Sequence, residues 1–233
     1  MTGRLDGPLL ALDSSTRAAY VAVGRGGRTL AVESVDARAN ASSALLPAVA
    51  RAVAAAGLTP AELGAVAVAG GPGSFTGLRI AAATAKGIVA ALGVPLYACS
   101  GLLALAAAHR DAGVPVCALF DARNREVYAG CWRFGGGVET VLGVEALGIE
   151  AVAGRLRGAE VRFVGEGALL HRGLLEDAFG HGAVLDGARS PAEGLLWLVS
   201  AGEIPEPVAD AAVWEPEYVR AAGAERSAAG GGG

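Results

Sequence analysis

The same order of predicted elements occurs twice along the 233 residues of the chain. In the first copy, three short strand-like runs begin at Leu9, and Asp13 stands at the turn after the first run. A helix, a buried strand and a glycine-rich loop follow. The pattern restarts at Val116, with Asp121 at the corresponding turn, and six residues separate the aspartate from a tyrosine in both copies. A repeated unit of this kind predicts two related lobes.

Hydrophobic periodicity, turn residues and capping residues predict the bounds of the elements. In the first copy the expected strands are residues 9–12, 19–23, 29–35, 65–69 and 95–99, and the expected helices are residues 42–56, 76–92 and 100–109. In the second copy the expected elements are strands over 116–120, 127–134, 138–144 and 161–164, a helix over 145–156, and a last helix that contains Leu195, Leu196 and Leu198.

The duplication predicts an α/β chain with mixed sheets in two lobes, in the pattern of the actin-, hexokinase- and Hsp70-like (ribonuclease H-like) fold. We expect an N-terminal lobe over residues 1–110 and an abridged C-terminal lobe over residues 111–226. Residues 227–233, SAAGGGG, are expected to be disordered because they have no apolar side chain large enough to bury.

Composition argues against several classes of protein. The net charge is −4 without any run of Lys or Arg, so strong binding of nucleic acid by this chain alone is not expected. Cys99, Cys117 and Cys131 form no C-x-x-C pair, which argues against a disulfide framework or a thiolate metal site. The longest apolar stretch, residues 80–99, is interrupted by a lysine and a proline, and the N-terminus lacks the features of a signal peptide. We therefore expect a cytoplasmic protein without a membrane span.

Four segments carry a resemblance to a known family. The most specific is Gly71-Pro72-Gly73-Ser74-Phe75-Thr76-Gly77-Leu78-Arg79, which follows a buried strand and opens a helix. The others are the opening LALDSST (residues 10–16), the second hairpin DARNREVY (121–128) and the closing EPEYVR (215–220). In this order, and over almost the whole chain, they resemble the TsaB (YeaZ) family.

The resemblance implies a task as well as a fold. TsaB proteins are similar in fold to the catalytic subunit TsaD, with which they heterodimerise, and the ATPase TsaE joins them. TsaD transfers a threonylcarbamoyl group from threonylcarbamoyl-adenylate to a tRNA adenosine next to the anticodon, and TsaB holds TsaD in a working state. The resemblance therefore implies a non-catalytic scaffold that meets tRNA only through the complex and forms a homodimer when TsaD is absent.

The histidines argue against a catalytic role. The catalytic paralogue binds a metal through a His-x-x-x-His pair on its first long helix, where two imidazoles one turn apart converge on one ion. This chain has only His109, His171 and His181, which form no such pair. Many family members keep one histidine just before this helix, but residues 39–41 are Ala-Asn-Ala here. We expect neither a metal site nor a catalytic residue.

The glycine loop does not match the better-known phosphate or nucleophile motifs. It lacks the lysine of a Walker loop, it has Thr76 where a dinucleotide fingerprint needs glycine, and Pro72 and Thr76 replace the glycines that flank the serine of a nucleophile elbow. Two interpretations stay open. We favour a tight turn in which Ser74 or Thr76 caps the following helix, and the alternative is an anion or nucleotide phosphate held at the helix N-terminus.

Asp13 and Asp121 raise the hypothesis of an ATPase, because kinases and chaperones of this fold hold phosphates with Asp-x-Gly turns in both lobes. Glycine is missing from both turns here, so we expect the two aspartates to be turn residues and expect no cofactor. A weak ATP or ADP contact shared with a partner stays open. The rival hypothesis is a stand-alone ATP-dependent phosphotransferase or glycoprotease-like hydrolase, against which the missing histidines and glycines argue.

The two helices over residues 42–56 and 76–92 carry more apolar residues than one core can bury. We expect one face of each helix to bind the TsaD-type subunit, or a second copy of this chain, while the other face packs on the sheet. The sequence does not separate the two faces. The candidate interface residues are Leu45, Leu46, Val49, Val53, Ile80, Thr84 and Ile88.

Overall fold

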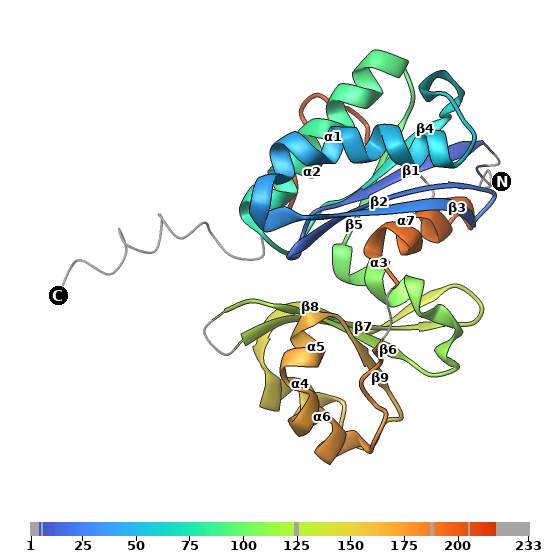
Figure 1. Ribbon diagram of the computed structural model, residues 1–233. Coiled ribbons are helices and arrows are strands. Elements are labelled where there is room, and N and C mark those ends of the chain that lie inside the picture. Colours follow the sequence, from blue (N-terminus) through green and yellow to red (C-terminus); the bar gives the residue numbers. More distant parts are fainter. Residues whose placement is uncertain (1–4, 6, 124–125, 187–188, 205, 218–233) are drawn as a thin grey trace.

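The computed structural model of the chain describes residue 5 and residues 7–123, 126–186, 189–204 and 206–217, with the backbone alone for residues 37–41. It contains two lobes, each built on one mixed sheet (Figure 1). The predicted tail over 227–233, the predicted end of the second lobe at residue 226 and Tyr218, Val219 and Arg220 lie outside the described residues.

The first lobe has a five-stranded sheet in the order β3-β2-β1-β4-β5. β1, β2 and β3 pair antiparallel, whereas β4 and β5 continue the sheet parallel to β1. The helices α1 and α2 cover one face, where their apolar side chains pack on those of β1, β2 and β4. The elements are β1 (Pro8–Asp13), β2 (Ala18–Arg25), β3 (Arg28–Asp36), α1 (Ala37–Ala55), a 3-10 turn (Pro60–Glu62), β4 (Ala65–Ala69), α2 (Phe75–Leu92) and β5 (Leu96–Cys99).

The second lobe repeats this topology in shortened form. Its sheet has the order β8-β7-β6-β9, and a single parallel bridge between Phe163 and Val184 lies where the first lobe has a fifth strand. The expectation of a duplicated fold with an abridged second lobe is confirmed. The elements are β6 (Val116–Asp121), β7 (Glu126–Phe134), β8 (Val138–Gly148), α4 (Ile149–Arg155), β9 (Arg162–Val164), α5 (Glu166–Leu170) and α6 (Arg172–Phe179).

Two helix predictions were wrong in their starting residue. Residues 145–148 continue β8 instead of opening a helix, because Glu145 and Leu147 pair with Ala129 and Val127 of β7. α4 therefore begins only at Ile149. In the first lobe α1 begins at Ala37, so the serines at 42 and 43 lie inside the helix and do not cap it.

Two helices, α3 (Gly101–Ala108) and α7 (Pro191–Ser200), lie between the sheets (Figure 1). Both cover the second face of the first sheet, and α3 also packs on β6 and β7 of the other lobe. A Cβ on Gly194 of α7 would overlap the carbonyl oxygen of Ala104, so glycine lets the two helices pack closely. The chain after residue 190, which we assigned to the second lobe, thus returns to the first, because the buried leucines of α7 cover a sheet face that would otherwise be exposed.

The chain then crosses the first lobe as a segment without helix or strand, residues 206–217, which we call the closing segment. The Val208 N–H donates to the Leu96 carbonyl oxygen at 2.7 Å, which places the closing segment beside β5, the edge strand of the sheet. Val208, Ala211 and Trp214 pack against the same core as α1 and α2. α1, α2 and the closing segment therefore contribute to one layer.

By length and hydropathy alone, α2 could cross a bilayer, and it is the one helix among the described residues that could. In the structure Leu78, Ala81 and Ala85 of this helix pack into the first lobe, and most of its exposed residues are small. Ser74 caps its start and Gly93, with φ of 68°, ends it in the left-handed conformation.

Candidate functional site

The signature loop, residues 71–79, leads the chain from β4 into α2. The Ser74 Oγ accepts a hydrogen bond from the Gly77 N–H at 3.3 Å, so Ser74 is the helix cap. The Ser74 N–H donates to the Ser15 carbonyl oxygen at 2.7 Å, which joins the loop to the turn after β1. Thr76, the other candidate cap, lies inside α2 and is exposed.

Contacts within the chain explain three glycines of the signature loop. A Cβ on Gly77 would overlap the Ser14 carbonyl oxygen, and one on Gly73 would overlap the backbone of Ser15. A Cβ on Gly71 would overlap the carbonyl oxygen of Glu217. Glycine therefore lets two other segments approach the loop closely. These contacts favour the capped-turn interpretation over a phosphate site.

The closing segment holds the loop from the other side. The Glu217 N–H donates to the Gly70 carbonyl oxygen at 2.8 Å, and the Trp214 indole lies 3.2 Å from the position of a Cβ on Gly70. Lys86 of α2 forms an ion pair with Glu215 at 3.1 Å. Three of the four segments that resemble the TsaB family thus meet at one place: the turn after β1, the signature loop and the start of the closing motif.

Asp13 is fully buried at the end of β1. Its Oδ1 accepts hydrogen bonds from the backbone N–H of Ser15 at 3.2 Å and from the Ser15 Oγ at 2.7 Å, so it is a turn residue. Burial raises the pKa of Asp13 from 3.8 to about 6, although the bonds from Ser15 oppose the rise. Its Oδ2 and the Ser14 Oγ have no hydrogen-bond partner among the described residues.

Asp121 is the last residue of β6, at the corresponding turn of the second lobe, and is only half-buried. Its Oδ1 accepts from the Arg123 N–H at 2.8 Å. The two turns differ in length, because Asp13 pairs with Tyr20 whereas Asp121 pairs with Val127. The equal spacing from aspartate to tyrosine in the sequence therefore does not mark structurally equivalent tyrosines.

Glu166 lies near both turns, and no sequence pattern pointed to it directly. It is the first residue of α5, and it interacts electrostatically with Arg17 of the first lobe and Asp121 of the second. Burial raises the pKa of Glu166, against the opposing effect of the Arg17 charge. The one signal in the sequence was its place in Gly165-Glu166-Gly167, the loop that echoes the signature loop.

Within the described ranges, no group of three His, Cys, Asp or Glu side chains is placed to bind a metal ion. His109 is buried at the end of α3, where desolvation lowers its pKa, and His181 is fully exposed beside Glu176. Cys99, Cys117 and Cys131 are free thiols.

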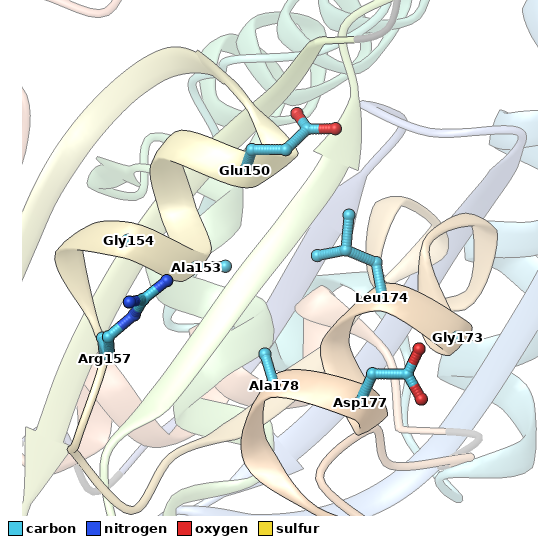
Figure 2. A pocket seen from close by; sticks show the side chains of 8 residues that line it. All are labelled: Glu150, Ala153, Gly154, Arg157, Gly173, Leu174, Asp177 and Ala178. Carbon is cyan, nitrogen blue, oxygen red and sulfur yellow. The ribbon is translucent and has the colours of Figure 1, made fainter.

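A groove lies between α4 and α6 of the second lobe (Figure 2). Glu150 and Arg157 border it on the α4 side, and Leu174 and Asp177 border it on the α6 side. The other residues that line it are small: Ala153, Gly154, Gly173 and Ala178. None of the residues that line it belongs to the four segments that resemble the TsaB family.

The structure separates the two faces of α1 and α2 and corrects part of the predicted interface. Leu45, Val49 and Val53 lie in the core of the first lobe, so they are not available to a partner. Leu46, in contrast, is 58% exposed. Ile80, Thr84 and Ile88 are half-buried, and the two isoleucines pack against the edge of the same core.

Small residues form most of the exposed surface of these helices. We call this surface the outer face. It consists of Leu46 and Ala50 on α1 and Ala83, Gly87 and Ala90 on α2. A Cβ on Gly87 would meet no atom within 4 Å, so no contact inside the chain requires glycine there. At the start of α2 the Arg79 guanidinium lies 4.3 Å from the centre of the exposed Phe75 ring, and both side chains extend this surface.

Comparison with known proteins identifies a matching family model and relatives of the chain. The family model of TsaD, the tRNA N6-adenosine threonylcarbamoyltransferase, matches residues 35–168, which is more than half of the chain. The "tRNA threonylcarbamoyladenosine biosynthesis protein TsaB" of Bacillus subtilis is 30% identical over 220 residues, which cover 93% of this chain and 96% of that protein.

Solved structures extend the likeness to the fold. A Pseudomonas aeruginosa protein described as similar to peptidase YeaZ has a TM-score of 0.76 at 33% identity and covers 92% of this chain and 100% of its own. Component A of the (R)-2-hydroxyglutaryl-CoA dehydratase of Acidaminococcus fermentans has a TM-score of 0.54 at 11% identity, over 84% of this chain and 97% of its own, which shows the fold alone. The fold is the actin- and hexokinase-like one, and the chain belongs to the TsaB (YeaZ) family.

Proposed function

We propose that the chain is a non-catalytic subunit that binds a TsaD-type transferase through the outer face of α1 and α2. Membership of the TsaB family supports a part in the biosynthesis of threonylcarbamoyladenosine in tRNA. In this account the TsaD-type subunit transfers the threonylcarbamoyl group from threonylcarbamoyl-adenylate, and this chain holds that subunit in its active arrangement.

The observation that carries the proposal is the composition of α2. Glycine inside a helix costs about 1 kcal/mol relative to alanine, yet a Cβ on Gly87 would meet no atom within 4 Å, so no steric contact inside the chain requires glycine there. The exposed alanines at 83 and 90 lie on the same side, about one turn away in each direction. Such a surface admits a second helix at short distance. A partner helix would therefore explain both the small residues and the apolar character of α2.

The packing of the turn after β1 supports the non-catalytic role. A phosphotransferase of this fold needs the turn after β1 to face a phosphate with open backbone N–H groups. Here Asp13, Ser14 and Ser15 are at most 3% exposed, and the signature loop packs directly on them. A triphosphate at this turn would have to displace the packing of the loop.

The remaining parts of the proposal follow the family. They are a TsaE-type ATPase as a third component, a homodimer through the same face when the TsaD-type subunit is absent, contact with tRNA only within the complex, and a cytoplasmic location. A shared contact with ATP or ADP at the subunit boundary is compatible with the exposed Arg79 and Phe75 at the start of α2.

Titration calorimetry with the purified TsaD-type subunit of the same cell tests the proposal. Gly87→Arg places a long charged side chain in the centre of the outer face, and we expect it to weaken binding at least tenfold. Gly154→Arg is the matched control, because Gly154 is also an exposed glycine in a helix with no atom within 4 Å of its Cβ position. Equal affinities for the two variants would refute the outer face as the binding surface.

A further inference from the structure

The closing segment runs beside α2 along the length of the helix. Backbone hydrogen bonds to the carbonyl oxygens of Leu96, which follows the end of α2, and Gly70, which precedes its start, fix the two ends of the segment. Between them, the Lys86 ammonium of α2 donates to the Ala212 carbonyl oxygen at 3.1 Å and pairs with the Glu215 carboxylate at 3.1 Å. The segment is therefore attached to the first lobe at both ends and in the middle.

An exposed valine of the closing segment lies at the border of the outer face. Lys86 comes three residues after Ala83 and four before Ala90, and residues at these spacings are neighbours on the surface of a helix. Because Lys86 holds the Ala212 carbonyl oxygen, the next residue, Val213, lies beside the outer face. Val213 is 73% exposed, more than any other large apolar side chain in the described ranges.

The charges of the closing segment all have the same sign. The segment carries four exposed acidic residues, which we call the acidic strip, and no Lys or Arg. They are Glu206, Asp210, Glu215 and Glu217. In the described part of the chain only Glu215 has an ion-pair partner, which is Lys86. A strip of this charge repels the phosphates of a nucleic acid and is complementary to a surface that carries Lys and Arg.

We propose that the closing segment is a second part of the partner-binding surface, with Val213 as an apolar anchor and the acidic strip as a charged rim. The outer face takes a helix of the TsaD-type subunit, and the closing segment takes a basic surface beside that helix. This inference rests on the proposed function, because both parts bind the same subunit. It adds the chemistry of the partner surface, which combines an apolar contact for Val213 with Lys or Arg side chains.

The closing segment holds Val213 in place before any partner binds. The next residue, Trp214, packs against the core of the first lobe. On the other side, the Asp210 Oδ1 accepts a hydrogen bond from the Ala212 N–H at 2.8 Å, which closes a turn before Val213. Because both flanks are fixed, little conformational entropy is lost when Val213 is buried by a partner.

Surface plasmon resonance with the immobilised TsaD-type subunit tests the anchor. Val213→Ser removes the apolar side chain without adding a charge, and we expect the dissociation constant to rise about tenfold, mostly through faster dissociation. Val141→Ser is the matched control, because Val141 is an exposed valine of β8 in the second lobe and is 40% exposed. Equal affinities of the two variants would overturn the role of Val213, even if Gly87→Arg weakens binding.

Reversal of two charges tests the acidic strip in the same experiment. The double variant Glu206→Lys, Glu217→Lys should associate at least tenfold more slowly than the wild type at low salt, and the difference should shrink at high salt. Glu139→Lys, Glu160→Lys is the control, because it changes the net charge equally at exposed positions of the second lobe. Equal association rates of the two double variants would contradict the acidic strip.

The outcome also separates this inference from the proposed function. Weaker binding by Gly87→Arg together with unchanged binding by Val213→Ser and the Glu206→Lys, Glu217→Lys variant would leave the outer face as the binding surface and refute the closing segment. The reverse result would support the closing segment and refute the outer face.

Discussion

At the scale of single residues, two kinds of glycine have opposite meanings in this chain. Gly71, Gly73 and Gly77 are required because other backbone segments lie where their side chains would be. Gly87 and Gly154 stand in open space on the surface of helices. The sequence shows all five as glycines, and only the structure separates internal packing from surfaces open to another molecule.

This contrast predicts opposite effects of one substitution. Gly77→Ala should lower the free energy of unfolding by several kcal/mol or prevent folding, because the new methyl group overlaps the Ser14 carbonyl oxygen. Gly87→Ala should raise it by about 0.5–1 kcal/mol, since alanine is the better helix former and no atom is in the way. Urea denaturation measures both, and a stabilised Gly77→Ala would contradict the described contact between the loop and the turn.

Asp13 predicts a pH dependence. Its pKa is raised to about 6 in the folded state, so the folded chain binds the proton more tightly than the unfolded chain. The stability that this gives is complete below about pH 4 and is lost as the pH rises through about 6. The stability of Asp13→Asn relative to the wild type should therefore increase by about 2 kcal/mol between pH 4 and pH 8. A difference between the two proteins that does not change with pH would show that Asp13 titrates normally.

At the scale of elements, the sequence predicts segments whose local pattern determines their structure, and it misses bounds that depend on contacts with distant segments. The strand 65–69 was predicted with the bounds that the structure has, because an apolar run of five residues between turn residues is too short for a typical helix. The end of β8 was missed because the pairing with β7, and not local preference, keeps residues 145–148 extended. α5 and α6 were also missed, and with them Glu166, since its position near both turns depends on contacts between segments that are distant in sequence.

The same limit applies to the candidate interface. Leu45 and Leu46 are adjacent leucines that a sequence pattern cannot rank, but one is in the core and the other is exposed. The signature loop was located correctly, and its capping serine was one of two candidates. Its contact with Glu217 joins segments that are far apart in the chain, and no local pattern predicts such a contact.

The two faces of α1 predict different results for the same charge. Val49→Asp should unfold the first lobe, because it places a carboxylate in a core site that is 7% exposed without any partner for the charge. Leu46→Asp should leave the melting temperature within a few degrees of wild type and weaken binding of the TsaD-type subunit. Thermal melts and calorimetry of both variants provide the test, and a folded Val49→Asp protein would contradict the described packing of α1.

At the scale of the whole molecule, the two connections between the lobes are tied to each other by an ion pair. Arg189 lies just before α7, and Asp111 lies just before β6. The Arg189 guanidinium donates two hydrogen bonds to the Asp111 carboxylate, at 2.6 Å and 2.8 Å. The Arg189 guanidinium also donates to the Ala108 carbonyl oxygen at the end of α3 at 2.7 Å. The two segments that connect the lobes therefore meet in one ion pair.

This ion pair is exposed to solvent, which limits its contribution. Arg189→Met should lower the free energy of unfolding by about 1 kcal/mol or less at low salt. The effect should shrink as salt screens the charges. Denaturation at two salt concentrations measures the change, and a loss of several kcal/mol that salt does not alter would mean that the pair acts as a buried contact.

The central claim is that this chain activates a transferase without being one. Transfer of the threonylcarbamoyl group to tRNA should be measured with the TsaD-type subunit, the TsaE-type ATPase, threonylcarbamoyl-adenylate and this chain. We predict full transfer with the wild type and with Gly154→Arg, little transfer with Gly87→Arg or without the chain, and none with the chain and tRNA alone. Transfer by the chain in the absence of the TsaD-type subunit, or undiminished transfer with Gly87→Arg, would contradict the account.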